Sequence, residues 1–296
     1  MPVVSGTEKE DLRICRSLNK KHGLNYYYAA AFFPEELRRS VYSLYAFLRV
    51  PDEIVDNNRS GAGGEERIKA ELSAWLGKWR AACRGDVSDE PVLRSALRVF
   101  RRYNIPYGYS EDFFRSMSMD IEKREYADYG ELREYMYGSA CVVGLMLCYI
   151  IGFNDPRALE YASCLGEAMQ LTNFLRDIEE DYRQRGRIYM PLDELAAHGL
   201  SREDIARRRF SPAFRDFMKL QVERSAGLYR RAQPGIAMLD KRGRLAVRVA
   251  SAFYSRILVK IRQMDYNIFL GRARSGTAEK AVLALRTLLN LSGGNI

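Results

Sequence analysis

Apolar residues recur every three or four positions along most of the chain, and no segment alternates convincingly between apolar and polar residues. This spacing predicts helices over residues 8–21, 34–57, 67–83, 90–103, 200–210, 212–233 and 244–269. Ser201, followed by Glu203 and Asp204, is typical of a helix N-cap with acidic residues in the first turn. Pro51 removes a backbone donor, so we expect a kink or a local break just before Asp52. The pattern therefore predicts an all-α fold.

The most apolar stretch is YMYGSACVVGLMLCYIIGF, residues 135–153. Its uncharged part is near the lower length limit for a membrane-spanning helix, and glycine, serine and cysteine interrupt it. A buried core helix is therefore favoured over a transmembrane helix. The small residues of this helix would leave room beside it for a long apolar ligand.

Polar residues form two stripes at helical spacing. The first comprises Tyr45, Arg49, Asp52 and Asp56, and the second comprises Gln170, Asn173, Asp177 and Asp181. Each stripe ends in DxxxD, which places two carboxylates one turn apart and is costly unless solvent or a cation compensates. A solvated helix face is the simpler explanation. Because apolar residues surround the second stripe, we favour a polar cavity in which carboxylate and amide oxygens bind hard divalent cations.

Two further groups of charged residues stay open to two interpretations. Asp120 and Arg124 form an i,i+4 pair, for which a surface ion pair is at least as plausible as a functional role. Arg183, Arg185 and Arg187 follow the second stripe in a glycine-containing loop. Their guanidinium groups suit bidentate contacts with phosphate oxygens, but a basic surface loop would explain them equally well.

The composition narrows the class of protein. With 296 residues, 47% of them hydrophobic, and no linker, low-complexity tract or clear repeat, we expect a single domain over 1–296, with flexible tails at about 1–7 and 290–296. The polar start lacks the apolar segment of a signal peptide, so we expect a cytoplasmic protein. Five cysteines without CxxC spacing suit reduced thiols, and two histidines give poor support to a zinc site or a Ser-His-Asp triad. If the protein binds a metal, oxygen atoms are therefore its expected ligands.

The formal net charge of +9 points to anionic partners, namely diphosphates, anionic lipid or nucleic acid. The sequence has no zinc finger, RNP-like aromatic motif or basic zipper, so nucleic-acid binding is disfavoured. Magnesium held by carboxylates commonly reaches its substrate through phosphate oxygens. An allylic diphosphate would leave a carbocation, which needs a dry cavity lined by apolar and aromatic side chains.

Four stretches of the chain resemble the head-to-head trans-prenyl synthases, which include phytoene, dehydrosqualene and squalene synthases. They are YSLYAFLRVPDEIVDN, MDIEKREYADYGELREYMYGSACVVG, GEAMQLTNFLRDIEEDYRQRGRIYMP and YSRILVKIRQMDYNIFLGR. DxxxD alone is a weak signal, whereas QLTNxLRD ahead of the second aspartate motif and RGRxYxP behind it are highly specific. The resemblance implies an all-α isoprenoid synthase fold in which the two motifs face each other across a central cavity.

The same resemblance implies roles for individual residues. Metal ligands for Mg²⁺, with Mn²⁺ as an alternative, would be Asp52, Asp56, Asn173, Asp177 and Asp181, with Gln170 beside them. Substrate contacts would come from Tyr45, Arg49, Tyr254 and Arg272 on the diphosphates, and from Arg187 and Tyr189, with Tyr135 near the reacting chain.

The family reaction joins two identical prenyl diphosphates through a cyclopropyl diphosphate, which ionises again and rearranges. Phytoene synthases then lose a proton, whereas squalene synthases take a hydride from NADPH. The segments QLTNFLRD and RGRIYMP are more similar to the phytoene synthases than to the squalene synthases. This similarity predicts that the substrates are two C20 geranylgeranyl diphosphates. The alternative is squalene or dehydrosqualene formation from C15 farnesyl diphosphate, with NADPH needed only for squalene. A non-catalytic relative used in protein assembly is disfavoured because all four aspartates are intact.

Two departures from the family pattern and one property of the product add further expectations. Leu24 and Asn25 stand where the family often has a Ser/Lys-bearing segment, which leaves the usual phosphate contacts there unassigned. Cys141 stands where glycine is common and would narrow the cavity. Because the expected product is insoluble in water and the chain is basic, we expect peripheral association with a membrane.

Overall fold

Helices make up the regular structure of the protein, as the spacing predicts. The computed structural model describes residues 7–22, 24–57 and 64–289, and no β-strand occurs within these ranges, only two isolated bridges. The α-helices are α1 Glu8–His22, α2 Leu24–Ala30, α3 Glu35–Asn57, α4 Gly64–Arg84, α5 Pro91–Arg102, α6 Gly108–Glu122, α7 Tyr129–Met136, α8 Val142–Ile151, α9 Ala158–Glu180, α10 Leu192–Ala197, α11 Arg202–Ala206, α12 Pro212–Ala232, α13 Lys241–Gln263 and α14 Thr277–Leu288. Two π-helical segments, η1 Tyr137–Cys141 and η2 Asp181–Arg185, and two 3₁₀ segments, η3 Gln233–Met238 and η4 Ile268–Leu270, connect them.

Local signals explain where several of these helices begin. Ser211 is the N-cap of α12, where its hydroxyl accepts a hydrogen bond from the Phe214 amide at 3.2 Å and a proline follows. At the start of α11, Ser201 and Asp204 form a capping box, which confirms the predicted N-cap.

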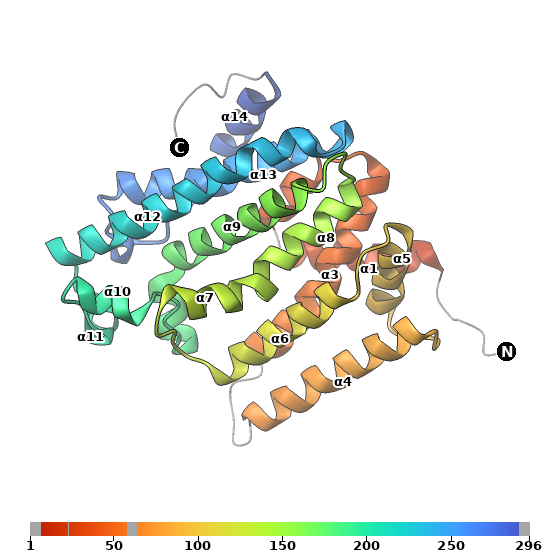
Figure 1. The fold of residues 1–296 in the computed structure, drawn as a ribbon, viewed down its shortest axis with the longest axis horizontal. Helices are drawn as coiled ribbons and strands as arrows, with labels where there is room; N and C mark the ends of the chain where they lie inside the picture. Colours follow the sequence, from red (N-terminus) through yellow and green to blue (C-terminus); the bar gives the residue numbers. More distant parts are fainter. Residues whose placement is uncertain (1–6, 23, 58–63, 290–296) are drawn as a thin grey trace.

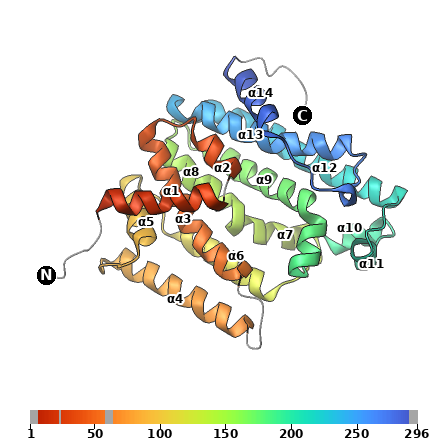
Figure 2. The same ribbon diagram turned by 180° about the vertical axis from the view of Figure 1, so that it is seen from behind.

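Helix α9 lies in the middle of the molecule, between α8 and α12 in the view of Figure 1, and it also packs against α13. One buried apolar cluster lies mainly among α1, α3, α5, α6 and α8, and a second lies among α7, α9, α12 and α13. Figure 2 shows α3, which carries the first polar stripe, left of the centre of the molecule and α9, which carries the second, right of it. The stripes therefore come from helices that belong to different parts of the core.

The apolar stretch at 135–153 is a buried core helix, as predicted. Its helical run, Tyr129–Ile151, is long and apolar enough to cross a membrane, but 61% of its most apolar window is buried inside the protein. Gly144 and Gly166 lie where this run crosses α9. A Cβ atom on Gly144 would lie 2.4 Å from the Ala162 carbonyl oxygen, and one on Gly166 would lie 2.5 Å from that of Ala140. Some of the small residues therefore allow close helix packing rather than ligand space.

Three details of the predicted helices are wrong. Helix α3 continues through Pro51, so a local break before Asp52 does not occur, and the alternative expectation, a kink there, stays a prediction. The helix expected over 200–210 is only α11, Arg202–Ala206, and the chain then turns through Arg208 at φ 54°. The helix expected over 244–269 ends at Gln263, because Asp265 and Tyr266 adopt the left-handed conformation. The expected tails lie outside the described residues, apart from Thr7.

Candidate active site

A cavity of about 650 Å³ lies between the two polar stripes. Its lining contains all thirteen residues predicted for the site: Tyr45, Arg49, Asp52, Asp56, Tyr135, Gln170, Asn173, Asp177, Asp181, Arg187, Tyr189, Tyr254 and Arg272. They come from α3, α7, α9, the segment around η2, α13 and the segment that precedes α14. The structure therefore brings every predicted site residue to one cavity.

Arginine side chains contact all four stripe aspartates. On α3, Arg49 pairs with Asp52 and with the neighbouring Glu53. On α9, Arg176 donates to both carboxylate oxygens of Asp177, at 2.8 and 2.6 Å. These arginines neutralise carboxylates that the helical spacing otherwise forces close together.

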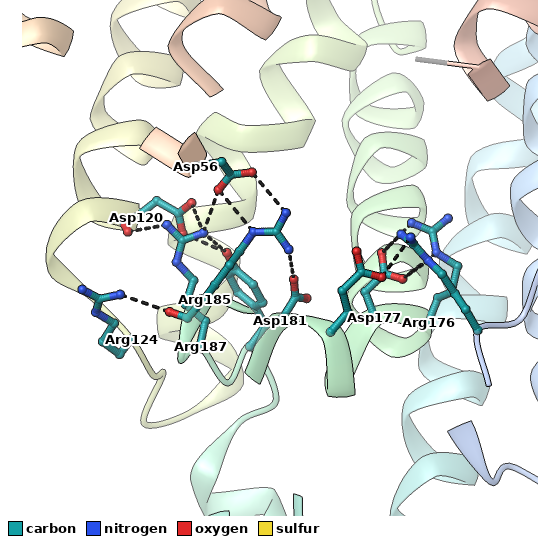
Figure 3. Close-up of polar contacts among 11 residues, drawn as sticks. Asp56, Asp120, Arg124, Arg176, Asp177, Asp181, Arg185 and Arg187 are labelled. Carbon is teal, nitrogen blue, oxygen red and sulfur yellow. Dashed lines mark hydrogen bonds and ion pairs between the residues drawn. The ribbon is translucent and has the colours of Figure 1, made fainter. Parts of the chain in front are cut away.

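One arginine bridges the two motifs. Arg185 Nη1 lies 2.9 Å from Asp181 Oδ1, and Arg185 Nε lies 3.3 Å from Asp56 Oδ1. Figure 3 shows the Arg185 guanidinium between the two carboxylates. Arg272, from the segment that precedes α14, contacts two acidic residues of α9. Its Nε lies 2.7 Å from Asp177 Oδ1, and its Nη1 lies 2.9 Å from Glu180 Oε2. The polar end of the cavity is thus an alternating array of carboxylates and guanidinium groups.

Asp120 lies in the wall of this cavity and not on the surface. It is 4% exposed, its Oδ2 lies 2.8 Å from Arg187 Nη1, and its Oδ1 accepts a hydrogen bond from the Tyr189 hydroxyl at 2.9 Å. Arg187 also donates to the Asp120 backbone carbonyl at 2.7 Å. Arg124 contacts Glu65 and the Arg185 carbonyl instead. The interpretation of Asp120 as part of a surface ion pair is therefore wrong.

The three arginines after the second stripe fall into different environments. Arg183 is 69% exposed at its side chain and pairs with Glu179, whereas Arg185 is 27% exposed and Arg187 is 2% exposed. The surface interpretation thus holds for Arg183, and the other two belong to the cavity.

Local backbone structure places the side chains of Arg185 and Arg187 in the cavity. The α9 helix widens into the π-helical η2 at Asp181–Arg185, and π-helical turns of this kind are frequent at functional sites. Gly186 then adopts φ 63°, a left-handed conformation that glycine tolerates. The Ile188 amide donates to the Arg124 carbonyl at 2.8 Å, which fixes the following segment against the end of α6. This attachment brings Arg187 to Asp120.

Burial, together with neighbouring acidic groups, raises the pKa of two stripe aspartates. Burial, with a smaller contribution from Asp56, raises the pKa of Asp52 to about 6, although Arg49 opposes the shift. Burial, with a contribution from Asp177, raises the pKa of Asp181 to about 7, although Arg185 opposes it. Burial also raises the pKa of Asp120. A cation bound among these groups would favour their ionised forms.

The donor atoms of the cavity suit a hard divalent cation. Asn173 Oδ1 is buried without a hydrogen-bond partner in the described structure, one helical turn before Asp177. Carboxylate and amide oxygens are the ligands that Mg²⁺ prefers. No three acidic, histidine or cysteine side chains within the described ranges are grouped so that they could hold a metal ion, and Arg185 lies between Asp56 and Asp181. The residues therefore fit a metal that would replace guanidinium groups as the counter-charge.

The aromatic side of the cavity is a stacked cluster. The rings of Phe174 and Tyr189 stack at a centroid distance of 4.1 Å, and Tyr135 stacks on Tyr189 at 5.6 Å. Burial raises the pKa of both tyrosines well above its ordinary value, so they stay neutral. The cavity thus offers neutral aromatic faces beside its charged end.

An apolar channel of about 130 Å³ adjoins the polar cavity and shares wall residues with it, Gln170 and Asn173 among them. Eleven of its 26 lining residues are alanine or glycine: Ala29, Ala30, Ala140, Gly144, Ala158, Ala162, Gly166, Ala232, Gly235, Ala246 and Ala250. The predicted space beside the small-residue helix is therefore present. Cys141 lines neither cavity and packs against Gly166, so its expected narrowing effect is wrong. The side chains of Leu24 and Asn25 lie outside the described residues.

Several cavity residues were missed by sequence reasoning. Arg176 precedes Asp177 directly, so the stripe spacing gives no reason to place both in one cavity. Lys21 at the end of α1 and Lys280 on α14 also line the cavity, and neither belongs to a recognisable motif. Only the excess of basic residues hinted at them.

Comparison with known proteins agrees with this geometry. Residues 19–279 match the family described as Squalene/phytoene synthase. The chain is 33% identical over 274 residues to the chloroplastic phytoene synthase 1 of Arabidopsis thaliana, covering 90% of this chain and 63% of the relative, so it spans less than two thirds of that protein. It is 29% identical to the phytoene synthase of Arthrospira platensis, covering 93% and 91% of the two chains. A crystal structure of a dehydrosqualene synthase in complex with ligand superimposes with a TM-score of 0.87 at 26% identity, covering 97% and 98%.

The helical shell, the central cavity and the two facing aspartate motifs define the terpenoid synthase-like fold. Within that class, the chain belongs to the squalene/phytoene synthase family.

Proposed function

We propose that the protein joins two geranylgeranyl diphosphates head to head into phytoene, through a cyclopropyl diphosphate, with Mg²⁺ as cofactor and release of diphosphate. The observation that carries the proposal is one cavity with two ends. Its polar end combines four aspartates with arginines, and an apolar channel with a small-residue lining adjoins it. A prenyl diphosphate has the same division into a charged head and a long apolar tail.

The polar end has separate groups for the cation and for the diphosphate. Asp52, Asp56, Asp177 and Asp181, together with Asn173, would hold the metal. When bound, Mg²⁺ would neutralise charge on the diphosphate and so make it a better leaving group. The arginines that contact these aspartates would be released to bind diphosphate oxygens. Guanidinium groups suit that contact because their paired donors match two oxygens at once.

The aromatic cluster would protect the cationic intermediates that follow loss of diphosphate. Tyr135, Phe174 and Tyr189 present neutral rings, and the negative face of a ring attracts a cation. The Tyr189 hydroxyl donates a hydrogen bond to Asp120, so this hydroxyl is held against the wall of the cavity. Such an arrangement would limit attack of the hydroxyl oxygen on a nearby carbocation.

The names of the sequence relatives favour C20 substrates. Both quoted sequence relatives are called phytoene synthases, and an apolar channel adjoins the polar cavity. The similarity to a dehydrosqualene synthase structure supports a second candidate, which joins two C15 farnesyl diphosphates. NADPH would be required only if the product were squalene.

An assay with matched variants tests the catalytic site. Asp177→Ala is expected to abolish formation of product from geranylgeranyl diphosphate and Mg²⁺, while circular dichroism keeps the helical signal of the unchanged protein. Glu160→Ala is the control, because Glu160 lies near the start of the same helix and outside the cavity lining. Full activity of Asp177→Ala would show that the metal site has been assigned wrongly.

We also propose that the protein associates peripherally with a membrane on its cytoplasmic side, since its product would be an apolar hydrocarbon. The net charge of +9 would favour an anionic surface.

A further inference from the structure

Helix α14 presents an apolar face to solvent. Four large apolar side chains on it are about half exposed: Val282 at 50%, Leu285 at 56%, Leu288 at 50% and the C-cap Leu289 at 58%. Ala278 and Ala281 are exposed as well. At 100° per residue these six positions fall within an arc of about 120°. We call them the α14 face: Ala278, Ala281, Val282, Leu285, Leu288 and Leu289.

This exposure is concentrated in one place. Ten large apolar side chains are exposed across the described ranges, and four of them belong to the α14 face. A fifth, Tyr28, lies beside the helix, since Lys280 Nζ is 5.8 Å from the centre of its ring. Scattered exposed apolar residues are normal, but a contiguous group marks an interaction surface.

The helix that carries the face is firmly attached. Its opposite side packs on α13, where Ala284 contacts the cluster of Val249 and Phe253. Glu279 forms ion pairs with Arg256 at 2.6 Å and with Lys260 at 3.1 Å. The exposed leucines are therefore a property of a docked helix and not of a frayed one.

The charge around the face is positive. The segment from Arg272 to Leu289 contains four basic residues and one acid, Glu279, which α13 already neutralises. Arg286 lies at the edge of the apolar arc and has no ion-pair partner in the described part of the chain; the same is true of Arg274, which precedes the helix. Apolar residues bordered by unpaired cations match the interface of an anionic lipid bilayer.

The position of the face relates it to the cavity. Arg274, Ser275 and Lys280, which lie just before or within α14, line the polar cavity. In both Figure 1 and Figure 2 the helix lies at the edge of the molecule, beyond α13. A bilayer that contacts α14 would therefore lie close to the catalytic cavity.

We propose that the α14 face binds the surface of an anionic bilayer and holds the cavity next to it, so that apolar product passes into lipid. The role in product transfer rests on the proposed function, whereas the binding itself does not. A second copy of the chain fits less well, because one face of a twelve-residue helix is small against the roughly 800 Å² per partner of a standard interface.

Sedimentation with vesicles tests the binding. Purified protein is mixed at low salt with vesicles of phosphatidylglycerol and phosphatidylcholine, or of phosphatidylcholine alone. The unchanged protein is expected to sediment with the anionic vesicles, and Leu285→Glu/Leu289→Glu is expected to lower its partition coefficient about tenfold or more. Val87→Glu/Leu220→Glu is the matched control, since those residues are 63% and 43% exposed elsewhere, and its partitioning should stay within about twofold of the unchanged protein.

Further measurements separate the outcomes. Arg286→Gln should weaken binding to the anionic vesicles only, and Leu285→Ser/Leu289→Ser should give an intermediate loss if the glutamate variant folds poorly. Turnover of detergent-dispersed substrate should be the same in the α14-face variants and in the unchanged protein, so a failed activity assay would leave the binding result intact. Equal sedimentation of the face variant and the control would overturn the proposal. So would a dimer in size-exclusion chromatography with light scattering that the face variant converts to a monomer.

Discussion

Arg185 Nε lies 3.3 Å from Asp56 Oδ1, although the two residues are 129 positions apart in the chain. The same guanidinium reaches Asp181 at 2.9 Å, so a single cationic side chain connects the two aspartate motifs. Burial is the main influence on the pKa of this arginine, yet the pKa stays raised because Asp56 and Asp181 lie so close. Arg185 thus occupies the place between the motifs that suits a divalent cation.

Replacing Arg185 is expected to change metal binding directly. In Arg185→Gln the cation no longer competes with a guanidinium, so Mn²⁺ should bind the substrate-free protein about tenfold more tightly or better. Electron paramagnetic resonance of unbound Mn²⁺ measures this affinity with and without inorganic pyrophosphate. In the unchanged protein pyrophosphate should strengthen Mn²⁺ binding, because it offers Arg185 another anionic partner, and in the variant this effect should shrink. Unaltered affinity in the variant would count against competition at this position.

The stability of the metal-free protein should fall as pH rises. The folded pKa values of Asp52, about 6, and Asp181, about 7, exceed the ordinary value of 3.8, so the folded state binds more protons than the unfolded state between about pH 4 and 7. Asp181→Asn should therefore melt on the order of 4 °C above the unchanged protein at pH 8 in a chelator. The difference should be clearly smaller near pH 5 and should vanish only below about pH 4, where Asp181 is protonated in both the folded and the unfolded state. Differential scanning calorimetry would refute this if the melting temperature of the variant exceeded that of the unchanged protein by the same amount at both pH values.

Asp120 and Arg187 should be strongly coupled in stability. Removing one partner of a buried ion pair leaves the other uncompensated, which costs about 3–5 kcal/mol. Asp120→Ala and Arg187→Ala should each lower the free energy of unfolding in urea by amounts of this order. The double variant should lose about 1–3 kcal/mol less than the sum. A fully additive double-mutant cycle would mean that the 2.8 Å contact has little energetic weight.

Narrowing the apolar channel should discriminate against longer substrates. Ala250 lines the channel on α13, so Ala250→Leu should reduce turnover of a C20 diphosphate about tenfold or more and affect a C15 diphosphate less. Ala252→Leu is the control, because Ala252 lies on the same helix and does not line either cavity. Competition between the two substrates in one reaction gives the ratio of kcat/KM values. Equal losses for both chain lengths would indicate general disruption.

Sequence reasoning found the candidate site because its main signal is local. Asp177 and Asp181 share a face simply because they are four residues apart on one helix, and Asp52 and Asp56 repeat that spacing. Roles for Tyr135, Tyr254 and Arg272 came instead from the family resemblance, and all thirteen predicted site residues line one cavity. Their roles as ligands and substrate contacts stay predictions.

Features that depend on tertiary packing could not be predicted. Asp120 meets Arg187 across 67 positions, and the contact exists because the segment after η2 attaches to the end of α6. The end of α13 depends on the left-handed Asp265 and Tyr266, at positions that carry neither glycine nor proline. Gly144 belongs to the small-residue stretch that suggested ligand space in the sequence, but its contact with the Ala162 carbonyl also serves close helix packing. Helical periodicity gives the faces of helices, whereas their neighbours come only from the fold.

Product analysis tests the proposed reaction most directly. Purified protein is incubated with Mg²⁺ and either geranylgeranyl or farnesyl diphosphate, and the extracted hydrocarbons are identified by chromatography and mass spectrometry. A C40 hydrocarbon with the mass of phytoene should form from the C20 substrate, should not need NADPH, and should disappear when a chelator is added. A product from the C15 substrate alone would contradict the assignment.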